Sequence, residues 1–517
     1  MTLRVFNTLS RRKEEFIPAS PEVVRIYTCG LTVYSSMHIG HARTYCFWDM
    51  FRRYLEYLGY HVLSVINYTD IDDRLMERAT ETLGSVDIAE KVIASFRRDC
   101  RMLRIKDYAV YTRATDFIRG QIEMVAALID SGHAYVVNGE VFYDVASFPG
   151  YGKLSGRTVE EQQVGASGRV SEDVSRKRHP ADFTLWKPSE GGQPSWQTGH
   201  SDWPQGRPGW HIECSVMSSA TLGATFDLHG GAVDNMFPHH ENEIAQSEPL
   251  CGCSTWVRYW MHPEHLDLRG EKMSKSLGNV LGVPDILAKH RYDELRWFYA
   301  MNHYRTKLAF SDELIDSAAE GYKKITNLLS ILTGRLMQWD GLDEGVPARG
   351  EYASLRAGDM RAPRLRHYYE YGEFGELATK VIAKFREAMD DDVNSPQATA
   401  ALFEYVNELY KAGIEASEDM ASVLAAYRCL TRHLYVLGIE LPNERLYPQL
   451  AMDCFPAADS AADTAAYDAF IEKLLAARAQ ARADKDWAKA DLLRDLLADC
   501  GLEVEDTAGG ARWKLKE

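Results

Sequence analysis

The sequence lacks long hydrophobic runs, an excess of positive charge and an obvious disulfide framework. No segment approaches the roughly 18 consecutive apolar residues of a membrane-spanning helix, and residues 1–16 carry charges without the apolar core of a signal peptide. Lys and Arg number 59 against 75 Asp and Glu, a net charge of −16. This balance argues against a protein that coats nucleic acid indiscriminately, because phosphate neutralisation needs clustered cations. A specific RNA partner held by local basic patches is still compatible with it.

Nine cysteines, an odd number, are scattered over 517 residues. A disulfide-stapled secreted domain would be shorter and denser in cysteine, so the pattern favours a reducing compartment, and we expect a cytoplasmic protein. An apolar share of 45% and a charged share of 26% are ordinary for a globular chain. The length predicts three or four domains with sizeable cores.

Strand-like runs alternate with amphipathic helical patterns from about residue 20 to 115. This alternation predicts an α/β fold with a doubly wound parallel sheet of Rossmann type. A Gly- and Ser-rich stretch, residues 118–203, breaks the alternation and is interpreted as an insertion into the sheet domain. After about residue 312 the sequence becomes almost wholly helical, beginning with the amphipathic run Asp312–Leu336.

Acidic residues cluster at Asp390–Asp392, just before Ser395 and Pro396. A metal site is one interpretation of three consecutive aspartates. A helix start explains them better, with Ser395 as N-cap, Pro396 in the first turn and the acidic groups near the positive end of the helix dipole.

The segment His38–His41 (HIGH) follows a strand-like run, Val23–Tyr27, and leads into a helical pattern over Thr44–Tyr60. A strand, a Gly-bearing turn and a helix N-terminus form an anion site, because unpaired backbone N–H groups and the helix dipole point at phosphates. The two histidines can also donate hydrogen bonds to ATP. We therefore predict that His38, Gly40 and His41 bind ATP, although such a histidine pair alone is often incidental.

The segment Lys272–Ser276 (KMSKS) lies more than two hundred residues farther along the chain. It is a Gly-flanked loop with two ammonium groups, compact mobile charges that suit a departing pyrophosphate. A basic Ser/Lys loop by itself is usually a solvated turn. Found in this order, the two motifs resemble the paired signatures of class I aminoacyl-tRNA synthetases. We predict that His38, His41, Lys272 and Lys275 are catalytic, and that Lys275 also contacts ATP.

A possible metal site begins with Pro238, which is interpreted as the first turn of a helix. His239 and Glu243 are four residues apart and share one face of that helix, a spacing that suits two ligands of one zinc ion. An i, i+4 pair of this kind is usually only a surface contact, so the pair needs further ligands before it supports a metal site.

Two cysteines can supply those ligands. Cys29 ends the strand before the histidine turn, and Cys214 follows residues 210–213, which we interpret as another strand. Side chains at the carboxyl ends of parallel strands meet in one crevice, so both thiols can approach the His239 helix. Four such ligands usually form a closed structural zinc site. Here Cys29 is only nine residues before His38, which predicts a site beside the ATP pocket.

The other cysteines are expected to be packing or surface thiols. Cys251 and Cys253 form a tempting pair, but their short spacing in a loop makes them poor candidates for metal ligands. The set comprises Cys46, Cys100, Cys251, Cys253, Cys429, Cys454 and Cys500.

Five segments resemble the cysteinyl-tRNA synthetase family closely, and the similarity runs from about residue 3 to 515. They are Cys29–Tyr34, Asn67–Asp73, Gly209–Cys214, Phe237–Gln246 and Lys485–Asp491. The resemblance implies one zinc ion per subunit, held by Cys29, Cys214, His239 and Glu243, to which the substrate thiolate binds directly. Thiolate is a soft ligand that zinc prefers to a serine hydroxyl of similar shape.

The resemblance also implies an order of domains. These are a Rossmann catalytic domain in two halves (1–117 and 204–253) around a connective insertion (118–203), a stem-contact region with the KMSKS loop (254–316), an all-α helical bundle (317–445), and a linker with a small C-terminal α+β anticodon-binding domain (446–517).

Further residues are assigned by the resemblance alone. The substrate cysteine would contact Cys29, Thr69, Asp70, Trp210 and His239. The ATP ribose would lie near Gly231 and Asp234, although Gly230–Asn235 has Ala, Val and Asn where the family often has Gly, Ser and Leu. The positions used around the anticodon correspond to Arg482, Trp487, Asp491, Arg494 and Asp506. An indole and an arginine suit unpaired RNA bases, although a Trp in an Ala-rich helix is more often a core residue.

The implied reaction joins L-cysteine to tRNA(Cys). The carboxylate of cysteine attacks Mg²⁺-bound ATP to give cysteinyl-adenylate and pyrophosphate, and the tRNA then displaces AMP. We expect a monomer with no DNA or membrane partner. Two rivals are a related zinc ligase that passes cysteine to the amine of an amino sugar, and a non-enzymatic zinc-bearing RNA-binding protein. The segment after about residue 445 argues against the first, and the intact KMSKS loop against the second.

Overall fold

A computed structural model gives the fold of the chain. It describes residues 2–79, 84–157, 176–268, 271–272, 281–336, 338, 372–440, 502–507 and 510–515, with 268, 271–272 and the last two ranges described as backbone only. The chain forms two compact units, Met1–Pro442 and Asn443–Glu517.

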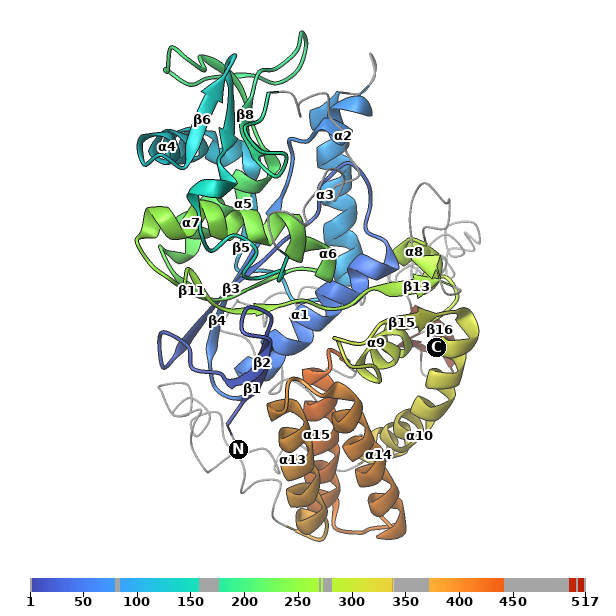
Figure 1. Ribbon diagram of the computed structural model, residues 1–517. Helices are drawn as coiled ribbons and strands as arrows, with labels where there is room; N and C mark the ends of the chain where they lie inside the picture. Colours follow the sequence, from blue (N-terminus) through green and yellow to red (C-terminus); the bar gives the residue numbers. More distant parts are fainter. Residues whose placement is uncertain are drawn as a thin grey trace, which may run out of the picture. The chain divides into compact units, whose positions relative to one another are not determined.

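The centre of the first unit is a five-stranded sheet in which all neighbouring strands are parallel (Figure 1). Its order is β12–β11–β3–β4–β5, which confirms the expected Rossmann-type fold. The strands are β3 (Val23–Thr28), β4 (His61–Tyr68), β5 (Val110–Arg113), β11 (Phe226–Gly230) and β12 (Val257–Met261). The last strand extends the sheet past residue 253, where we expected its second half to end.

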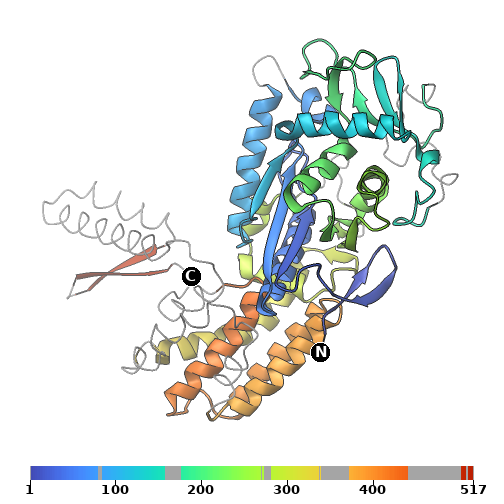
Figure 2. The ribbon, with the colours of Figure 1, turned by 90° about the vertical axis from the view of Figure 1, so that its left-hand side faces the viewer.

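Helices cover both faces of this sheet. On one face α1 (Ile39–Tyr57) and α3 (Ser85–Met102) pack together through the rings of Tyr45 and Phe96. The helices α5 (Trp210–Leu222) and α7 (Glu241–Cys251) lie on the other face. They pack against strand side chains that point to that face, such as Tyr27 and Val65. Figure 2 shows α3 and the pair α5 and α7 on opposite sides of the strands. The chain order reverses between β3 and β11, so this edge is the topological switch point where ligands bind in such sheets.

The insertion is an antiparallel sheet of order β6–β7–β8–β10–β9 packed beside α4 (Ile118–Asp130). Its strands are β6 (Ala134–Val137), β7 (Glu140–Tyr143), β8 (Phe183–Lys187), β9 (Trp196–Gln197) and β10 (Gln205–Pro208). Strand β10 pairs with β8 and β9, so the insertion sheet continues beyond residue 203, the boundary expected from composition.

Helix α5 corrects one sequence-based expectation. We interpreted residues 210–213 as a strand, and they form the first turn of this helix. The helix is buried on most of its surface, from Ile212 to Ser218 without interruption. A short run of apolar residues in such a helix lacks the periodicity that separates a helix from a buried strand.

The helical part of the first unit contains α10 (Asp312–Leu336), α13 (Gly375–Asp390), α14 (Ser395–Lys411) and α15 (Met420–Val436). The expected bounds of α10 are confirmed. The N-cap of α14 is Asn394, not Ser395, because the Asn394 side chain accepts a hydrogen bond from the Gln397 N–H.

The aspartates before α14 have partners of their own. Asp392 is buried and accepts hydrogen bonds from the Phe6 N–H, the Tyr304 hydroxyl and the Arg305 guanidinium. It therefore ties the N-terminal hairpin to the helical part of the chain, a function beyond the dipole compensation expected for this cluster.

Short elements connect these layers. They are β1 (Arg4–Asn7), β2 (Arg12–Glu15), α2 (Asp73–Glu77), η1 (Ala114–Phe117), η2 (Val145–Ser147), α6 (Val233–Asn235), η5 (Met236–His240), β13 (Leu266–Leu268), β14 (Glu271–Lys272), α8 (Val283–Leu287), α9 (Tyr292–Ala300) and β15 (Leu308–Phe310). Within the described ranges, no helix combines the length and the apolar character needed to cross a bilayer.

The second unit is described only as an antiparallel hairpin of β16 (Leu502–Thr507) and β17 (Gly510–Leu515). Asp506 lies on β16 opposite Ala511. The other four residues expected at the anticodon, Arg482, Trp487, Asp491 and Arg494, lie outside the described residues.

Gly30 provides a test of how tightly the switch point is packed. A Cβ atom at this position would lie 1.8 Å from the Asn67 carbonyl oxygen of β4. We expect Gly30→Ala to lower the free energy of unfolding by about 1–3 kcal/mol, because backbone atoms must move to relieve the overlap. Chemical denaturation measures this. Gly334→Ala is the control, since its Cβ meets nothing within 4 Å and alanine favours the helix; equal stability of the two variants would contradict the packing argument.

Candidate active site and metal centre

Four buried side chains from four parts of the fold converge beside the switch point. The ligand atoms of Cys29, Cys214, His239 and Glu243 all lie within 4.8 Å of one another. Cys29 follows β3, Cys214 lies on α5, and the other two lie on η5 and α7. The four residues that we predicted as a metal site are therefore brought together, although Cys214 reaches the cluster from a helix instead of a strand end.

The distances suit one small cation. The Sγ atoms of Cys29 and Cys214 are 4.0 Å apart, and His239 Nε2 is 3.1 Å from Glu243 Oε1. A tetrahedral zinc ion with Zn–S distances of about 2.3 Å would hold two sulfurs roughly 3.8 Å apart. Two soft thiolates, an imidazole and a carboxylate also form a donor set that zinc accepts. The residues present therefore fit the expected ion.

A second set of donors overlaps the first. Cys29, His229, His240 and Glu243 also place their ligand atoms within 4.8 Å of one another. His229 and His240 are not among the residues predicted from the sequence. The sequence does contain a signal for each of them. His240 directly follows His239, and His229 lies near the end of the buried strand β11.

Hydrogen bonds surround both sets of donors. His229 Nε2 is 2.7 Å from Glu243 Oε2, so this histidine holds the oxygen that faces away from His239. His240 Nδ1 is 2.8 Å from His262 Nε2, and the other nitrogen of His262 is 2.9 Å from the Thr8 hydroxyl. Outer-shell partners of this kind orient metal ligands. His240 Nε2 also lies 3.2 Å from Cys29 Sγ. The first set offers zinc two soft thiolates against one in the second, so it supplies the better ligands, and His229 holds Glu243 from outside it.

Burial controls the electrostatics of the cluster. Burial raises the pKa of the Cys29 thiol well above its ordinary value, and the neighbouring Cys214 raises it further. Burial also raises the pKa of Glu243 and lowers that of His239. Each shift disfavours the charged form of a group in a protein environment without a cation. A divalent ion reverses this preference, because it stabilises thiolate and carboxylate directly.

The histidine turn begins helix α1. His38 is the N-cap, and its Nδ1 accepts hydrogen bonds from the N–H groups of Gly40 (3.1 Å) and His41 (3.2 Å). The two histidine rings stack with centroids 3.6 Å apart. Since Nδ1 of His38 is an acceptor, a neutral ring carries its proton on Nε2, which makes that nitrogen a donor.

This geometry corrects the expected anion site. The Ile39 N–H donates to the Leu281 carbonyl, and the Ala42 N–H to the His38 carbonyl. Together with the two bonds to His38 Nδ1, all four N–H groups of the first turn have partners inside the protein. The Gly40 N–H is engaged by His38 here, and ATP binding at Gly40 stays a prediction. The imidazoles and the helix dipole are the further groups that this turn offers to a phosphate.

The stem of the lysine loop is bound to the same turn. His38 forms an antiparallel bridge with Gly282, just after the loop. On the other side of the loop, the buried Arg43 guanidinium of α1 donates to four carbonyl oxygens, those of Glu264, His265, His303 and Thr306. Lys272 is described as backbone on β14, and Lys275 lies outside the described residues.

The residues expected around the amino acid lie at the same edge of the sheet. Trp210 stacks on His239 with ring centroids 4.2 Å apart and an interplanar angle of 12°. Thr69 is buried and its hydroxyl accepts a hydrogen bond from the Asn67 amide. Asp70 accepts two hydrogen bonds from Thr115, and burial raises the pKa of Asp70.

Gly231 and Asp234, the two residues assigned to the ribose, have different surroundings. Gly231 directly follows β11, and a Cβ there would lie 2.7 Å from the Asn235 Oδ1 atom. Asp234 is half exposed and its Oδ1 lies 3.2 Å from His265 Nε2. The unusual residue Asn235 thus occupies the space above the glycine.

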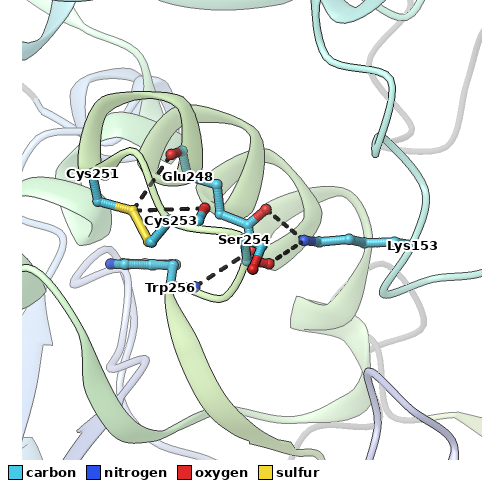
Figure 3. The surroundings of a disulfide bond; sticks show 6 residues. All are labelled: Lys153, Glu248, Cys251, Cys253, Ser254 and Trp256. Atoms are coloured by element: carbon cyan, nitrogen blue, oxygen red, sulfur yellow. Dashed lines mark hydrogen bonds and ion pairs between the residues drawn. A yellow bond between two sulfur atoms is a disulfide. The ribbon is translucent and has the colours of Figure 1, made fainter.

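The pair Cys251 and Cys253 differs from our expectation of packing or surface thiols, because it forms a disulfide (Figure 3). Gly252 between them has φ 62°, a left-handed conformation that turns the chain back at the end of α7. Cys46, Cys100 and Cys429 are free and buried, as expected of packing thiols. Cys454 and Cys500 lie outside the described residues.

Comparisons with family models and with solved structures identify the structural class of the chain. The model for the class I (C) tRNA synthetase catalytic domain matches residues 15–320, a DALR domain matches 384–441, and a cysteinyl-tRNA ligase anticodon binding domain matches 464–513. The structure of Mycobacterium tuberculosis methionyl-tRNA synthetase with methionyl-adenylate has a TM-score of 0.56 at 15% identity over 84% of this chain and 93% of that one. This likeness shows the fold, which is that of class I aminoacyl-tRNA synthetases.

Full-length relatives narrow the class to a family. A cysteine–tRNA ligase of Syntrophobacter fumaroxidans is 41% identical over the whole of both chains. One from Heliobacterium modesticaldum is 39% identical over 99% of this chain and 100% of its own. The chain belongs to the cysteine–tRNA ligase family.

The two overlapping donor sets can be distinguished by how the loss of one histidine changes the zinc content of the protein. We expect His239→Asn to lower zinc affinity strongly, because it removes a direct ligand. His240→Asn should retain zinc with a loss of about 10–100-fold or less, the effect of an outer-shell change. Metal analysis after dialysis against a zinc buffer measures both. The reverse order, with zinc retained only in His239→Asn, would assign the site to Cys29, His229, His240 and Glu243.

Proposed function

We propose that this protein joins L-cysteine to tRNA(Cys) in two steps, through a cysteinyl-adenylate, and that a zinc ion selects the substrate by its thiol. The observation that carries the proposal is the convergence of Cys29, Cys214, His239 and Glu243 beside the histidine turn, in a chain of the cysteine–tRNA ligase family.

The zinc ion, when bound, supplies a soft Lewis acid that favours a thiolate over the hydroxyl of serine. Trp210 forms a wall beside this site, since it stacks on His239. Hydrophobic pockets separate near-isosteres poorly. Recognition of sulfur at this point would therefore give the selectivity that pocket shape alone does not.

The protein groups act on ATP by position and charge. In the proposal His38 and His41 donate to the phosphates, and Lys272 and Lys275 stabilise the charge that develops on pyrophosphate as the cysteine carboxylate attacks the α-phosphate of Mg²⁺-bound ATP. Gly231 and Asp234 are proposed to contact the ribose. The Arg43 contacts and the His38–Gly282 bridge support this assignment, because they hold both ends of the lysine loop beside the histidines.

The transfer step uses the C-terminal part of the chain. The match of residues 464–513 to an anticodon-binding domain supports tRNA as acceptor, and it disfavours an amino sugar, which has no anticodon. Arg482, Trp487, Asp491, Arg494 and Asp506 are proposed to read the anticodon. We further propose a monomer that works in the cytoplasm.

The amino-acid selectivity is tested by ATP–pyrophosphate exchange with cysteine and with serine. We expect exchange with cysteine to exceed that with serine by at least about 10⁴-fold in kcat/KM, since a polar site built for one ligand rejects the analogue that lacks the group. Removal of zinc by a chelator should reduce exchange with cysteine to near the serine level. Equal exchange with both amino acids would contradict selection by the thiol.

The role of the lysine loop is tested with Lys275→Ala. We expect cysteine-dependent exchange to fall by about 10²–10³-fold, the loss seen when one preorganised group at a developing charge is removed. Zinc content should not change. The control is Lys289→Ala, a change of an exposed lysine beyond the loop. Exchange at the wild-type rate in Lys275→Ala would rule out the proposed role.

A further inference from the structure

A buried network of four charged side chains lies at the opposite end of helix α1 from His38. Arg53 Nε donates to Asp49 Oδ2 at 2.9 Å, and the Arg296 guanidinium of α9 donates to the same carboxylate. Arg53 Nη2 donates to Glu440 Oε1 at 2.8 Å. The side chains of Asp49, Arg53 and Arg296 are at most 1% exposed, whereas that of Glu440 is 33% exposed.

The charges balance only when Glu440 is included. Although burial alone raises the pKa of Asp49, Arg53 and Arg296 hold it at about 2, so this carboxylate is ionised. Two guanidiniums and one carboxylate leave one positive charge inside the protein. An uncompensated buried charge is costly, and Glu440 supplies the missing negative charge.

The backbone that follows α15 passes close to the side chains of this network. Gly438 has φ +80°, and a Cβ at this position would lie 1.7 Å from Arg296 Nη2. The chain therefore passes directly over the guanidinium, where a side chain would collide with it. Arg53 also stacks on the Tyr435 ring at 4.3 Å, and the Tyr292 hydroxyl donates to the Glu440 carbonyl. The segment Gly438–Glu440 is thus held from several directions.

This segment is the last described part of the unit Met1–Pro442. The residues that match an anticodon-binding domain, 464–513, follow it in sequence. Helix α1 therefore has the proposed ATP-contacting histidines at its first turn and, near its last, a charged group bonded to the point where the chain leaves the helical bundle.

We infer that Glu440 is a positioning residue for the tRNA-dependent step: its bond to Arg53 fixes the start of the linker relative to helix α1. The inference rests on the proposed function. The groups proposed for adenylate formation are the histidine turn, the lysine loop and the zinc site, and none of them belongs to the C-terminal residues, so loss of this bond should spare the first step. Charging of tRNA needs the C-terminal residues and the active site to engage one molecule, so the second step should depend on the bond.

Glu440→Gln tests the inference, because it removes the charge and retains the shape. We expect cysteine-dependent ATP–pyrophosphate exchange within two-fold of wild type, and kcat/KM for tRNA charging lowered by about ten-fold, chiefly through a higher KM for tRNA. Glu440→Asp, which keeps the charge, should recover most of the loss. Glu418→Gln changes an exposed glutamate of the same bundle and should leave both steps unchanged.

Three outcomes would overturn the inference. They are wild-type charging by Glu440→Gln, equal loss of exchange and charging, and a lowered kcat with an unchanged KM for tRNA. If Glu440→Gln fails to fold, the same two assays on Arg53→Lys decide the question, with a selective rise in KM for tRNA again expected and Glu440→Asp as the near-wild-type control. Failure of the proposed function is distinguishable, because wild-type protein would then show neither exchange nor charging.

Discussion

The reversal of chain order between β3 and β11 is the constraint on which the rest of the site depends. It opens one crevice at the carboxyl edge of the sheet, and Cys29 and His229 reach that crevice from the two neighbouring strands. Helices α5 and α7 cover the same face and contribute Cys214 and Glu243. A cluster of sulfur, nitrogen and oxygen donors results that no single segment of the chain could form.

Much of this could be predicted from the sequence, because the strongest signals are local. The parallel sheet follows from alternating patterns, helix α10 from its periodicity, and the four donors from their spacing and family resemblance. The errors have physical causes. Helix α5 is buried nearly all round and so lacks a helical stripe, strand β10 joins the insertion sheet through pairing that composition does not reveal, and the disulfide depends on the backbone conformation of Gly252.

Other features depend on tertiary contacts. Nothing local shows that His229 holds one oxygen of Glu243, since fourteen residues separate them. The network of Asp49, Arg53, Arg296 and Glu440 joins positions as far apart as 387 residues. Charged residues at such positions appear in the sequence as ordinary surface groups, and only the fold shows that three of them are buried and that the fourth balances their charge.

The self-capped start of helix α1 has a consequence for nucleotide capture. Because His38 and Leu281 already satisfy the N–H groups of the first turn, this turn needs no anion to be ordered. In the proposed reaction, ATP would meet a prearranged pair of stacked imidazoles and lose little free energy to organising the backbone. Changes in the side chains of this turn would then alter ATP affinity without disrupting the backbone of helix α1.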